Sequence, residues 1–263
     1  MLGLGSSLVT GGGVQGLIPS EISGLELHLK VNTGIVGNAG GASADGDMAD
    51  GEDINSWADQ SGRARHASQA SAAKKPHWET DAADFGGLKW TDDTADPYMD
   101  LAQYSSADLV ISANEDFTIM IRVKLTDFST VMALIGDDGN DVIKWASNKL
   151  VKTLIGGTGA KSWEEASDVL ATDTYYIHTL TRSDDATGNL TYHVHGGSYS
   201  DKSWDSSETH TDADEFTLSN IGSSSDGNLP AEGVFKDVIV WKGTALTSSQ
   251  RADMYSYING QEY

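Results

Sequence analysis

Short strand-like runs separated by turn residues constrain the fold of this chain more than any other feature of its sequence. The runs lie at residues 24–31, 116–125, 131–135, 149–155, 175–182, 190–194, 215–220 and 234–241, and Gly, Asp, Asn and Ser gather between most of them. Short strands that recur with turn chemistry between them are typical of all-β sandwiches. We therefore predict an all-β fold, a two-sheet antiparallel jelly-roll sandwich, from about residue 21 to the end.

Three segments carry the most detailed predictions. Residues 24–31 alternate apolar and polar side chains, so Leu25, Leu27, Leu29 and Val31 should share one face of a strand. Residues 116–125 form the best candidate for a central core strand, in which Phe117, Ile119, Ile121, Val123 and Leu125 share one parity. Near the end, Thr247 is a good N-cap for a short helix whose Met254, Tyr257 and Ile258 are spaced to face the sandwich.

The first 20 residues differ from the rest and predict a flexible, glycine-rich N-terminal arm, followed by the sandwich at residues 21–263. The arm has no helical or strand period. It contains scattered apolar residues, namely Leu2, Leu4, Leu8, Val9, Val14, Leu17 and Ile18. It is either a disordered tail or a segment that orders on a partner. We predict the second, with the arm as the attachment element of the protein.

The composition limits the classes of partner that the protein can bind. The chain of 263 residues has a formal net charge of −22, so phosphate backbones and anionic membranes would be repelled. There are no cysteines, which excludes disulfides and thiolate metal sites. The sequence contains no run of about 18 apolar residues, so it does not predict a membrane-spanning helix. The N-terminus does not have the pattern of a secretory signal. We expect no nucleic-acid and no membrane partner.

The order of the strand segments resembles the concanavalin A-like lectin/glucanase superfamily in its laminin-G-like form. The resemblance covers residues 21 to 260 and rests on an ordered series of segments: the strand at 24–29, the turn Trp57-x-Asp59-x-Ser61-Gly62, the strand at 116–119, the hairpin 175–178 to 192–196, and the closing strand at 235–241 with its terminal helix. In the turn, the Asp59 side chain should bond nearby backbone N–H groups. The resemblance implies two antiparallel sheets packed face to face.

The first 13 residues are similar to the glycine-rich openings of structural proteins from marine tailed bacteriophages, including cyanophages. Such proteins often carry a laminin-G-like sandwich, are acidic and lack secretion signals, because lysis releases them. Together with the absence of cysteine and the strong acidity, this resemblance implies a virion protein that is made in the host cytoplasm.

A search for catalytic residues finds none. Glucanases of this superfamily share a Glu-x-Asp-x-x-Glu strand whose carboxylates face one cleft. That spacing does not occur here, and Glu164, Glu165 and Asp168 come nearest in a polar segment. His193 and His195 share one face of a strand without an evident third metal ligand. We therefore predict no enzyme and no catalytic, cofactor or metal site.

Acidic loops are the one serious candidate for a ligand. Asp45, Asp47, Asp50, Glu52 and Asp53 crowd one loop, and Asp137, Asp138, Asn140 and Asp141 crowd another. Oxygen-rich loops suit calcium, but neither loop matches the Asp-x-Asp-x-Asp-Gly template. In a chain this acidic, solvated loops are the favoured interpretation.

The tryptophans bear on the choice between a structural protein and a carbohydrate-binding module. Trp57, Trp90 and Trp241 look structural, whereas Trp145, Trp163 and Trp204 lie among polar residues and are the candidates for an exposed platform that stacks on a sugar. The leading hypothesis is a non-enzymatic virion structural protein, a capsid decoration or accessory protein attached to other virion proteins through its arm. The alternative is a carbohydrate-binding, lectin-like module of a phage tail or fibre that recognises a host-surface glycan.

Overall fold

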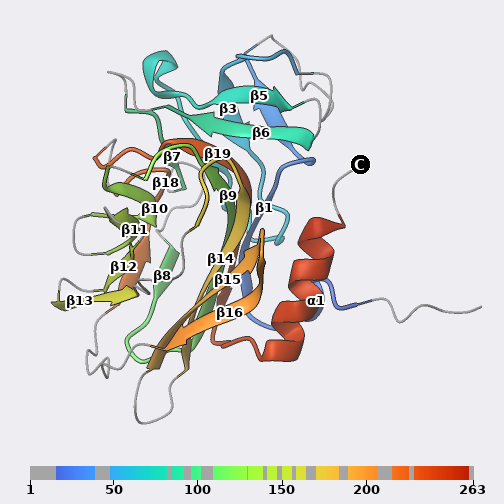
Figure 1. Cartoon of the computed structure of the whole chain (residues 1–263). Coiled ribbons are helices and arrows are strands. Elements are labelled where there is room, and N and C mark those ends of the chain that lie inside the picture. Colours follow the sequence, from blue (N-terminus) through green and yellow to red (C-terminus); the bar gives the residue numbers. More distant parts are fainter. Residues whose placement is uncertain are drawn as a thin grey trace, which may run out of the picture.

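The structure is a computed structural model of the whole chain, and it describes residues 16–38, 48–81, 84–91, 96–101, 109–128, 130–138, 141–146, 150–155, 158–163, 170–183, 189–205, 215–224 and 228–260. In these residues the chain forms two antiparallel β-sheets packed face to face, with a C-terminal helix against the outside of one of them (Figure 1). The predicted all-β sandwich with a short C-terminal helix is confirmed.

Sheet A is the eight-stranded layer that carries the helix. Its strands run in the order β16 (Tyr199–Asp205), β15 (Asn189–Gly196), β14 (Tyr175–Ser183), β9 (Phe117–Leu125), β19 (Gly233–Lys242), β6 (Asp84–Trp90) and β5 (His77–Asp81), and β1 (Leu25–Lys30) also pairs with β19. The predicted hairpin is β14–β15, in register from Ile177↔His195 to Ser183↔Asn189. The predicted closing strand is β19, which pairs with three neighbours.

Sheet B is the nine-stranded opposite layer. It runs in the order β13 (Thr158–Trp163), β12 (Leu150–Ile155), β11 (Val142–Ala146), β10 (Met132–Gly136), β18 (Asn220–Ile221), β7 (Met99–Asp100), β4 (Ala67–Ser68), β3 (Ile54–Trp57) and β2 (Ile35–Gly37). A separate pair joins β17 (Phe216–Leu218) to β8 (Leu109–Ile111), and two 3₁₀ turns are η1 (Pro19–Glu21) and η2 (Ala72–Lys74). The predicted run at 215–220 is thus divided between two sheets.

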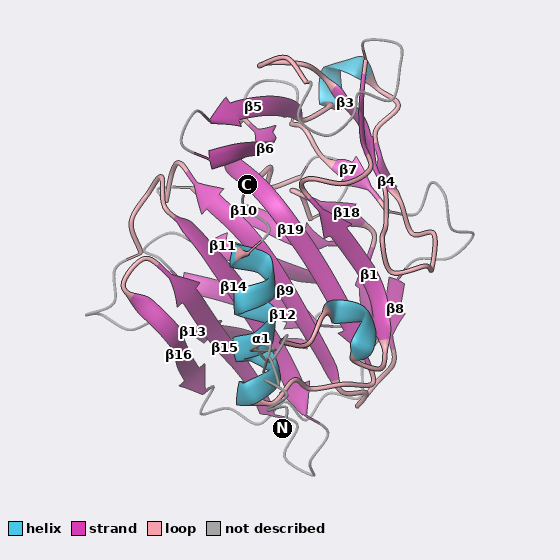
Figure 2. Cartoon of the chain, turned by 90° about the vertical axis from the view of Figure 1, so that its right-hand side faces the viewer, coloured by secondary structure: helices cyan, strands magenta, loops and turns pink. Residues whose placement is uncertain are grey.

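The central strand β9 lies between two cores. Its odd-numbered side chains face the main core between the sheets, as their shared parity predicts. Met120, on the other parity, lies in a second core under the helix α1 (Ser248–Asn259). Figure 2 shows α1 lying across the outer face of sheet A. Burying each such apolar side chain contributes about 1.5–3 kcal/mol, so both faces of β9 stabilise the fold.

The helix begins as predicted. Gln250 N–H donates to Thr247 Oγ1 at 3.3 Å, and Thr247 N–H donates to Gln250 Oε1 at 2.9 Å, which forms a capping box. Met254 and Ile258 are fully buried against sheet A, and Tyr257 is half-buried beside them. Among the described residues, no helix is long and apolar enough to span a membrane.

One face prediction is wrong in β1. Leu27 and Leu29 lie in the main core, whereas Leu25 lies in the core under α1. The cause is a β-bulge: Leu25 pairs with Trp241 and Leu27 pairs with the adjacent Val240, so one extra residue shifts the alternation. A strict period of two holds only where the ladder is regular, which is why the sequence pattern misplaced Leu25.

The end of the predicted arm is in contact with the sandwich. Pro19 is buried, Trp241 Nε1–H donates to the Pro19 carbonyl at 3.3 Å, and Ile22 lies in the core under α1. Residues 1–15 lie outside the described residues, so the extent and role of the arm stay predictions.

Candidate functional site

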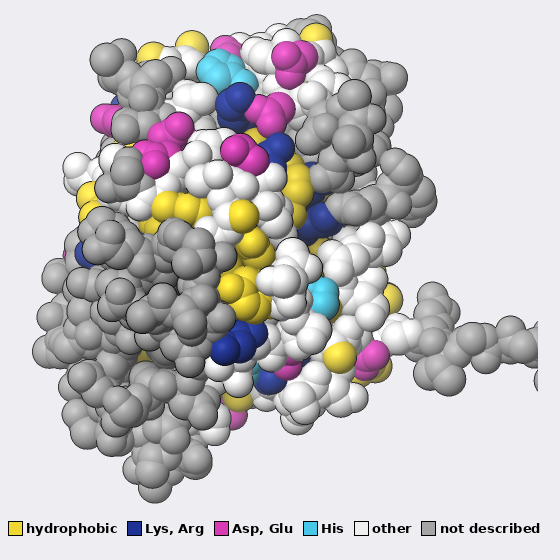
Figure 3. All heavy atoms as spheres, viewed as in Figure 1, with side chains coloured by type: hydrophobic (Ala, Val, Ile, Leu, Met, Phe, Trp, Pro, Cys, Tyr) yellow, Lys and Arg dark blue, Asp and Glu magenta, His cyan; other side chains and the backbone are white. Residues whose placement is uncertain are grey.

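The hairpin formed by β5 and β6 carries a surface groove of about 470 Å³. We call it the β5–β6 groove; the residues that line it are Asp50, Gly51, His77, Trp78, Glu79, Thr80, Lys89 and Thr91. Figure 3 shows histidine, basic and acidic side chains gathered on this part of the surface. The volume lies within the range of pockets that hold small organic ligands.

The outward side chains of the groove follow from strand alternation. Trp78 pairs with Leu88, and both point into the main core with 3% and 0% exposure. His77 and Glu79, on either side of Trp78, therefore point outward, as does Lys89, the partner of His77. The same alternation could have been read in the sequence, but Gly86 and Gly87 interrupt it and hide the second strand.

Those two glycines let β6 lie close to its neighbours. Gly86 has a φ of +93°, and a Cβ there would lie 2.5 Å from the Glu79 carbonyl oxygen. A Cβ on Gly87 would lie 2.5 Å from Val234 Cγ1. Side chains at either position would push β6 away, so the glycines preserve the spacing between β5, β6 and β19.

The other wall of the groove is the acidic segment at residues 48–53, which hydrogen-bonds to the outer edge of β5. Gly51 N–H donates to the Trp78 carbonyl at 2.8 Å, and Trp78 N–H donates to the Glu52 carbonyl at 2.7 Å. Asp50 Oδ1 accepts the Thr80 N–H at 3.0 Å. These bonds satisfy the edge of β5 and hold Asp50 at the rim.

Ion pairs link the charged groups at the groove. The Glu79 carboxylate pairs with Lys89 Nζ through Oε2 and with Lys124 Nζ through Oε1, the latter at 3.4 Å. His77 Nδ1 lies 3.0 Å from Asp53 Oδ1. The carboxylates of Asp50, Asp53 and Glu79 thus lie at or beside the groove, together with the ammonium groups of Lys89 and Lys124.

The sequence prediction located part of this site. Asp50 and Asp53 of the first acidic loop lie at the groove, Glu52 Oε2 instead accepts the Ala49 N–H at 3.3 Å, and Asp45 and Asp47 lie outside the described residues. The contributions of β5 and β6 were not recognised from the sequence. Their only signal was the broken alternation described above.

The second acidic loop bonds to backbone. Asp138 Oδ1 accepts the Asp141 N–H at 3.0 Å, and Asp141 Oδ2 accepts the Thr217 N–H at 3.2 Å. Asn140 lies outside the described residues, as do Glu164, Glu165 and Asp168. Within the described part of the chain, no three His, Asp or Glu side chains are grouped so that they could hold a metal ion. Solvated loops stay the favoured interpretation of both segments, and calcium binding stays the alternative.

The predicted aromatic platform is wrong at Trp145. Its side chain is 0% exposed in the main core, with its ring centroid 4.7 Å from Phe128. The reason is that β11 pairs on both sides, with β10 and β12, and Trp145 lies in the row that faces sheet A. The side chains of Trp163 and Trp204 lie outside the described part.

The tryptophans assigned to structure are confirmed as core residues. Trp57, Trp90 and Trp241 are all 0% exposed. Trp57 Nε1–H donates to the Lys30 carbonyl at 2.9 Å. The Asp59 turn is confirmed as well, because Asp59 Oδ1 accepts the His28 and Ser61 N–H groups, each at 2.9 Å.

The two histidines on β15 share one face, as predicted, and that face lies against α1. His195 stacks on Tyr255 with ring centroids 4.3 Å apart, and burial lowers its pKa although Asp201 opposes the shift. His193 Nδ1 lies 3.7 Å from Asp201 Oδ1. These rings help to dock the helix.

Asp201 is the centre of a hydrogen-bonded clamp on α1 that sequence reasoning missed. It accepts Arg251 Nη2 at 3.0 Å and Nε at 3.2 Å, and its Oδ1 accepts Tyr255 Oη–H at 2.7 Å. Burial raises the pKa of Asp201, but these bonds outweigh it and hold the pKa below its ordinary value. The clamp joins the edge strand β16 to the helix across about 50 residues of chain.

A buried charge cluster lies beyond the C-terminal end of α1. Asp237 is 1% exposed, and neither carboxylate oxygen has a hydrogen-bond partner among the described residues. Burial raises the pKa of Asp237 to about 6, against the opposing effect of Arg122, Lys236 and Lys30. Arg122 Nη1 also lies 3.5 Å from the Ile258 carbonyl at the end of the helix.

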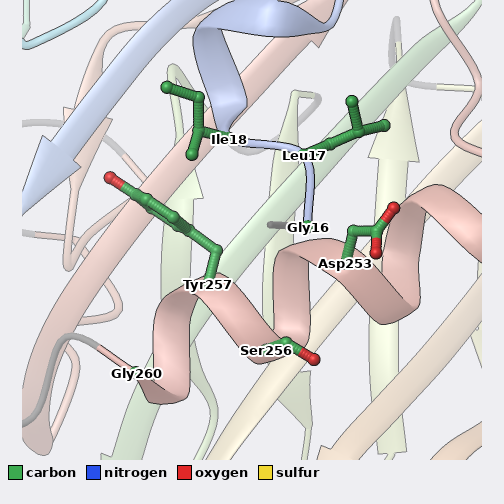
Figure 4. A pocket seen from close by; sticks show the side chains of 7 residues that line it. All are labelled: Gly16, Leu17, Ile18, Asp253, Ser256, Tyr257 and Gly260. Carbon is green, nitrogen blue, oxygen red and sulfur yellow. The ribbon is translucent and has the colours of Figure 1, made fainter. Parts of the chain in front are cut away.

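A second hollow, of about 280 Å³, lies between residues 16–18 and α1. Figure 4 shows Leu17 and Ile18 on one side and Asp253, Ser256, Tyr257 and Gly260 on the other. Leu17 is 36% exposed. This hollow has fewer polar groups than the β5–β6 groove, and it lies where the N-terminal segment meets the helix.

Comparison with known proteins places the fold but not the function. No family model matches the chain, and no curated protein resembles it in sequence. Trypanosoma rangeli sialidase in complex with 2,3-difluoro-KDN superposes with a TM-score of 0.51 at 15% identity, covering 90% of this chain and 33% of the sialidase chain. This chain therefore spans about a third of the sialidase.

Two botulinum neurotoxin structures are also similar. The binding domain of neurotoxin DC in complex with SialylT has a TM-score of 0.53 at 10% identity, and neurotoxin type C, whose cell entry depends on two ganglioside molecules, has 0.51 at 12%. They cover 90% and 91% of this chain and 52% of each toxin chain. Likenesses at this level of identity show the fold alone.

Proposed function

We propose that this chain is a non-catalytic binding domain that holds a glycan in the β5–β6 groove. The observation that carries the proposal is the composition of the groove: carboxylates of Asp50 and Glu79, the ammonium group of Lys89 and the hydroxyls of Thr80 and Thr91 line one hollow of about 470 Å³. Sugar hydroxyls both donate and accept hydrogen bonds, so a binding site needs both kinds of partner.

The rigidity of the groove supports a binding role. Its polar side chains extend from two paired strands whose inward residues are packed in the main core, and its loop wall is bonded to β5 by main-chain hydrogen bonds. A site built on such elements loses little conformational entropy when a ligand binds. The likeness to a sialidase, to a toxin binding domain in complex with SialylT and to a ganglioside-dependent toxin makes a glycan the first class of ligand to test.

We further propose that the domain is no enzyme. The carboxylates at the groove already accept hydrogen bonds or ion pairs from Thr80, Lys89, Lys124 and His77. Most glycosidases need one carboxyl group kept protonated as an acid opposite a second carboxylate, and sialidases use a tyrosine as the nucleophile instead. Release of product from a fluorogenic sialoside or β-glucan by the purified chain would overturn this part of the proposal.

A matched pair of lysines tests the binding site. Lys89 pairs with Glu79 in the groove, and Lys242 pairs with Glu115 elsewhere, with side-chain exposures of 39% and 30%. We expect Lys89→Ala to weaken binding to an oligosaccharide array at least tenfold and Lys242→Ala to leave it unchanged. Equal effects of the two changes, or no glycan bound by the unaltered chain, would refute the groove as a glycan site.

The second candidate role is that of a virion structural protein, a capsid decoration or accessory protein attached through the arm. One observation favours this structural role and is compatible with glycan binding. Gly16 lies against Asp253 of α1, whereas the groove lies over β5 and β6, so the arm leaves the sandwich at a different element from the groove (Figure 1). A protein held by its arm would keep the groove accessible.

Deletion of residues 1–15, the part of the 20-residue arm that precedes the packed segment, tests this second role. Residues 1–15 precede the segment that packs on α1, and the packed contacts of Pro19 and Ile22 remain when they are removed. We expect the truncated chain to keep its urea midpoint but to be lost from purified particles. Normal occupancy of the truncated chain in particles would show that attachment occurs through the sandwich.

A further inference from the structure

We infer that the β5–β6 groove selects neutral glycans and discriminates against acidic ones, including those that end in sialic acid. The inference rests on the proposed function and assigns its class of ligand. The likeness to a sialidase and to the SialylT-bound toxin domain would suggest an acidic, sialylated ligand. The inference of a neutral ligand follows instead from the charges of this chain.

Both lysines at the groove already have a carboxylate partner. Glu79 bridges them: its Oε2 pairs with Lys89 and its Oε1 with Lys124 at 3.4 Å. The side chains of Glu79, Lys124 and Lys89 are 22%, 12% and 39% exposed, so water screens the Lys89 pair more than the Lys124 pair. A sugar carboxylate in the groove would have to compete with Glu79 for Lys89, which is the lysine that lines the groove.

The facing wall adds the negative charges of Asp50 and Asp53. Asp50 Oδ1 accepts the Thr80 N–H, and Asp53 lies beside His77 while its Oδ2 accepts the Asn38 Nδ2–H at 2.8 Å. An anionic ligand would therefore meet Asp50 on the loop side, with Asp53 beside His77, in a chain whose net charge is −22. Each such like charge costs on the order of tenfold in affinity at the partly screened distances of a surface groove.

A neutral sugar fits the same groups. Its hydroxyls donate to the carboxylates of Asp50 and Glu79, and they accept from the Lys89 ammonium group and from Thr80 or Thr91. Hydrogen bonds to charged acceptors are the stronger ones. The carboxylates that repel an acidic sugar can therefore accept hydrogen bonds from a neutral one, and the ion pairs of Glu79 need not break.

The architecture also predicts how the selectivity can be inverted. Glu79→Gln keeps the shape of the side chain but removes the charge that holds Lys89 and Lys124. Asp50→Asn removes the charge of the opposite wall and keeps an oxygen that can accept the Thr80 N–H. The double variant leaves two ammonium groups against Asp53 alone, so the groove becomes positive and should prefer an acidic ligand.

The experiment uses oligosaccharides presented in pairs, with and without a terminal sialic acid, and measures binding of the full chain at pH 7.5. We expect the unaltered chain to bind the neutral member at least tenfold more tightly, Glu79→Gln or Asp50→Asn to reduce this ratio, and the double variant to reverse it. Raising the salt concentration should shrink the ratio for the unaltered chain.

Glu115→Gln is the control, because Glu115 pairs with Lys242 outside the groove and its loss should leave the ratio unchanged. Tighter or equal binding of the sialylated member by the unaltered chain overturns the inference while the proposed glycan site stands. An unchanged ratio in a folded double variant also overturns it. Absence of binding to every pair, in all variants, overturns the proposed function itself.

Discussion

Acid should lower the free energy of unfolding through protonation of His178, a residue of β14 whose side chain is 4% exposed in the main core. Its Nδ1 lies 2.6 Å from Tyr192 Oη, and its ring meets the edge of Trp145 with centroids 6.2 Å apart. Burial lowers the pKa of His178 from 6.5 to about 4, because the main core does not solvate an imidazolium ion. The folded protein therefore resists a proton that the unfolded chain accepts.

The sign and size of the effect follow from linkage. A lowered folded-state pKa contributes stability that is present above pH 6.5 and is lost as the pH falls toward 4. The shift corresponds to about 3 kcal/mol in all, of which about 2 kcal/mol is lost by pH 5. His28 shifts in the same direction and Asp237 in the opposite one, so the contribution of His178 must be isolated by difference.

The perturbation is His178→Gln, which keeps a hydrogen-bonding side chain but cannot be protonated. Urea unfolding of both proteins at pH 7.5 and pH 5 gives the difference in unfolding free energy at each pH, and the other titrating groups cancel. We expect the variant to be less stable at pH 7.5, with the gap narrowing by about 2 kcal/mol at pH 5. A gap that is the same at both pH values would refute the reasoning.

Three further changes test other parts of the structure. Asp237→Asn should gain about 2 kcal/mol of unfolding free energy relative to the unaltered chain between pH 4 and pH 7. The reason is that burial raises the folded-state pKa of Asp237 to about 6, so the stability contributed by its protonated form is lost as the pH rises through that value. Parallel pH profiles in urea unfolding would contradict this. Arg251→Ala should cost about 2 kcal/mol by breaking the clamp on Asp201, and much of that cost should vanish in a double-mutant cycle with Asp201→Asn. Trp145→Ala should cost about 3–5 kcal/mol of unfolding free energy by opening a cavity and should leave glycan binding of the folded protein unchanged.

Local patterns predicted the features that depend on neighbouring residues. The parity of the apolar residues in β9 and the capping chemistry of Thr247 are properties of consecutive residues, and both were confirmed. The structural roles of Trp57 and Trp241 were also recognised, because each lies in a segment with a strand or turn signal. The fold class followed from the repetition of such segments.

The candidate site could be predicted only in part, because its members come from separate segments. Asp50 attracted notice in an acidic loop, but nothing in the sequence indicated that Thr80 bonds to it. The bridge from Glu79 to Lys124 spans 45 residues and depends on how β5, β6, β19 and β9 lie side by side. Trp145 was misplaced for the same reason, since its polar neighbours in sequence do not show that β11 is paired on both edges.

The sequence by itself determined that this chain is a sandwich, where its strongest strands run and that its helix begins after Thr247, since alternation and capping act over a few residues. Only the tertiary structure decided that a bulge turns Leu25 toward the helix, that Asp201 holds Arg251, and that Glu79 pairs with both Lys89 and Lys124. Those outcomes depend on strand register and strand order. Burial of the main core sets both, and it depends on all the segments together.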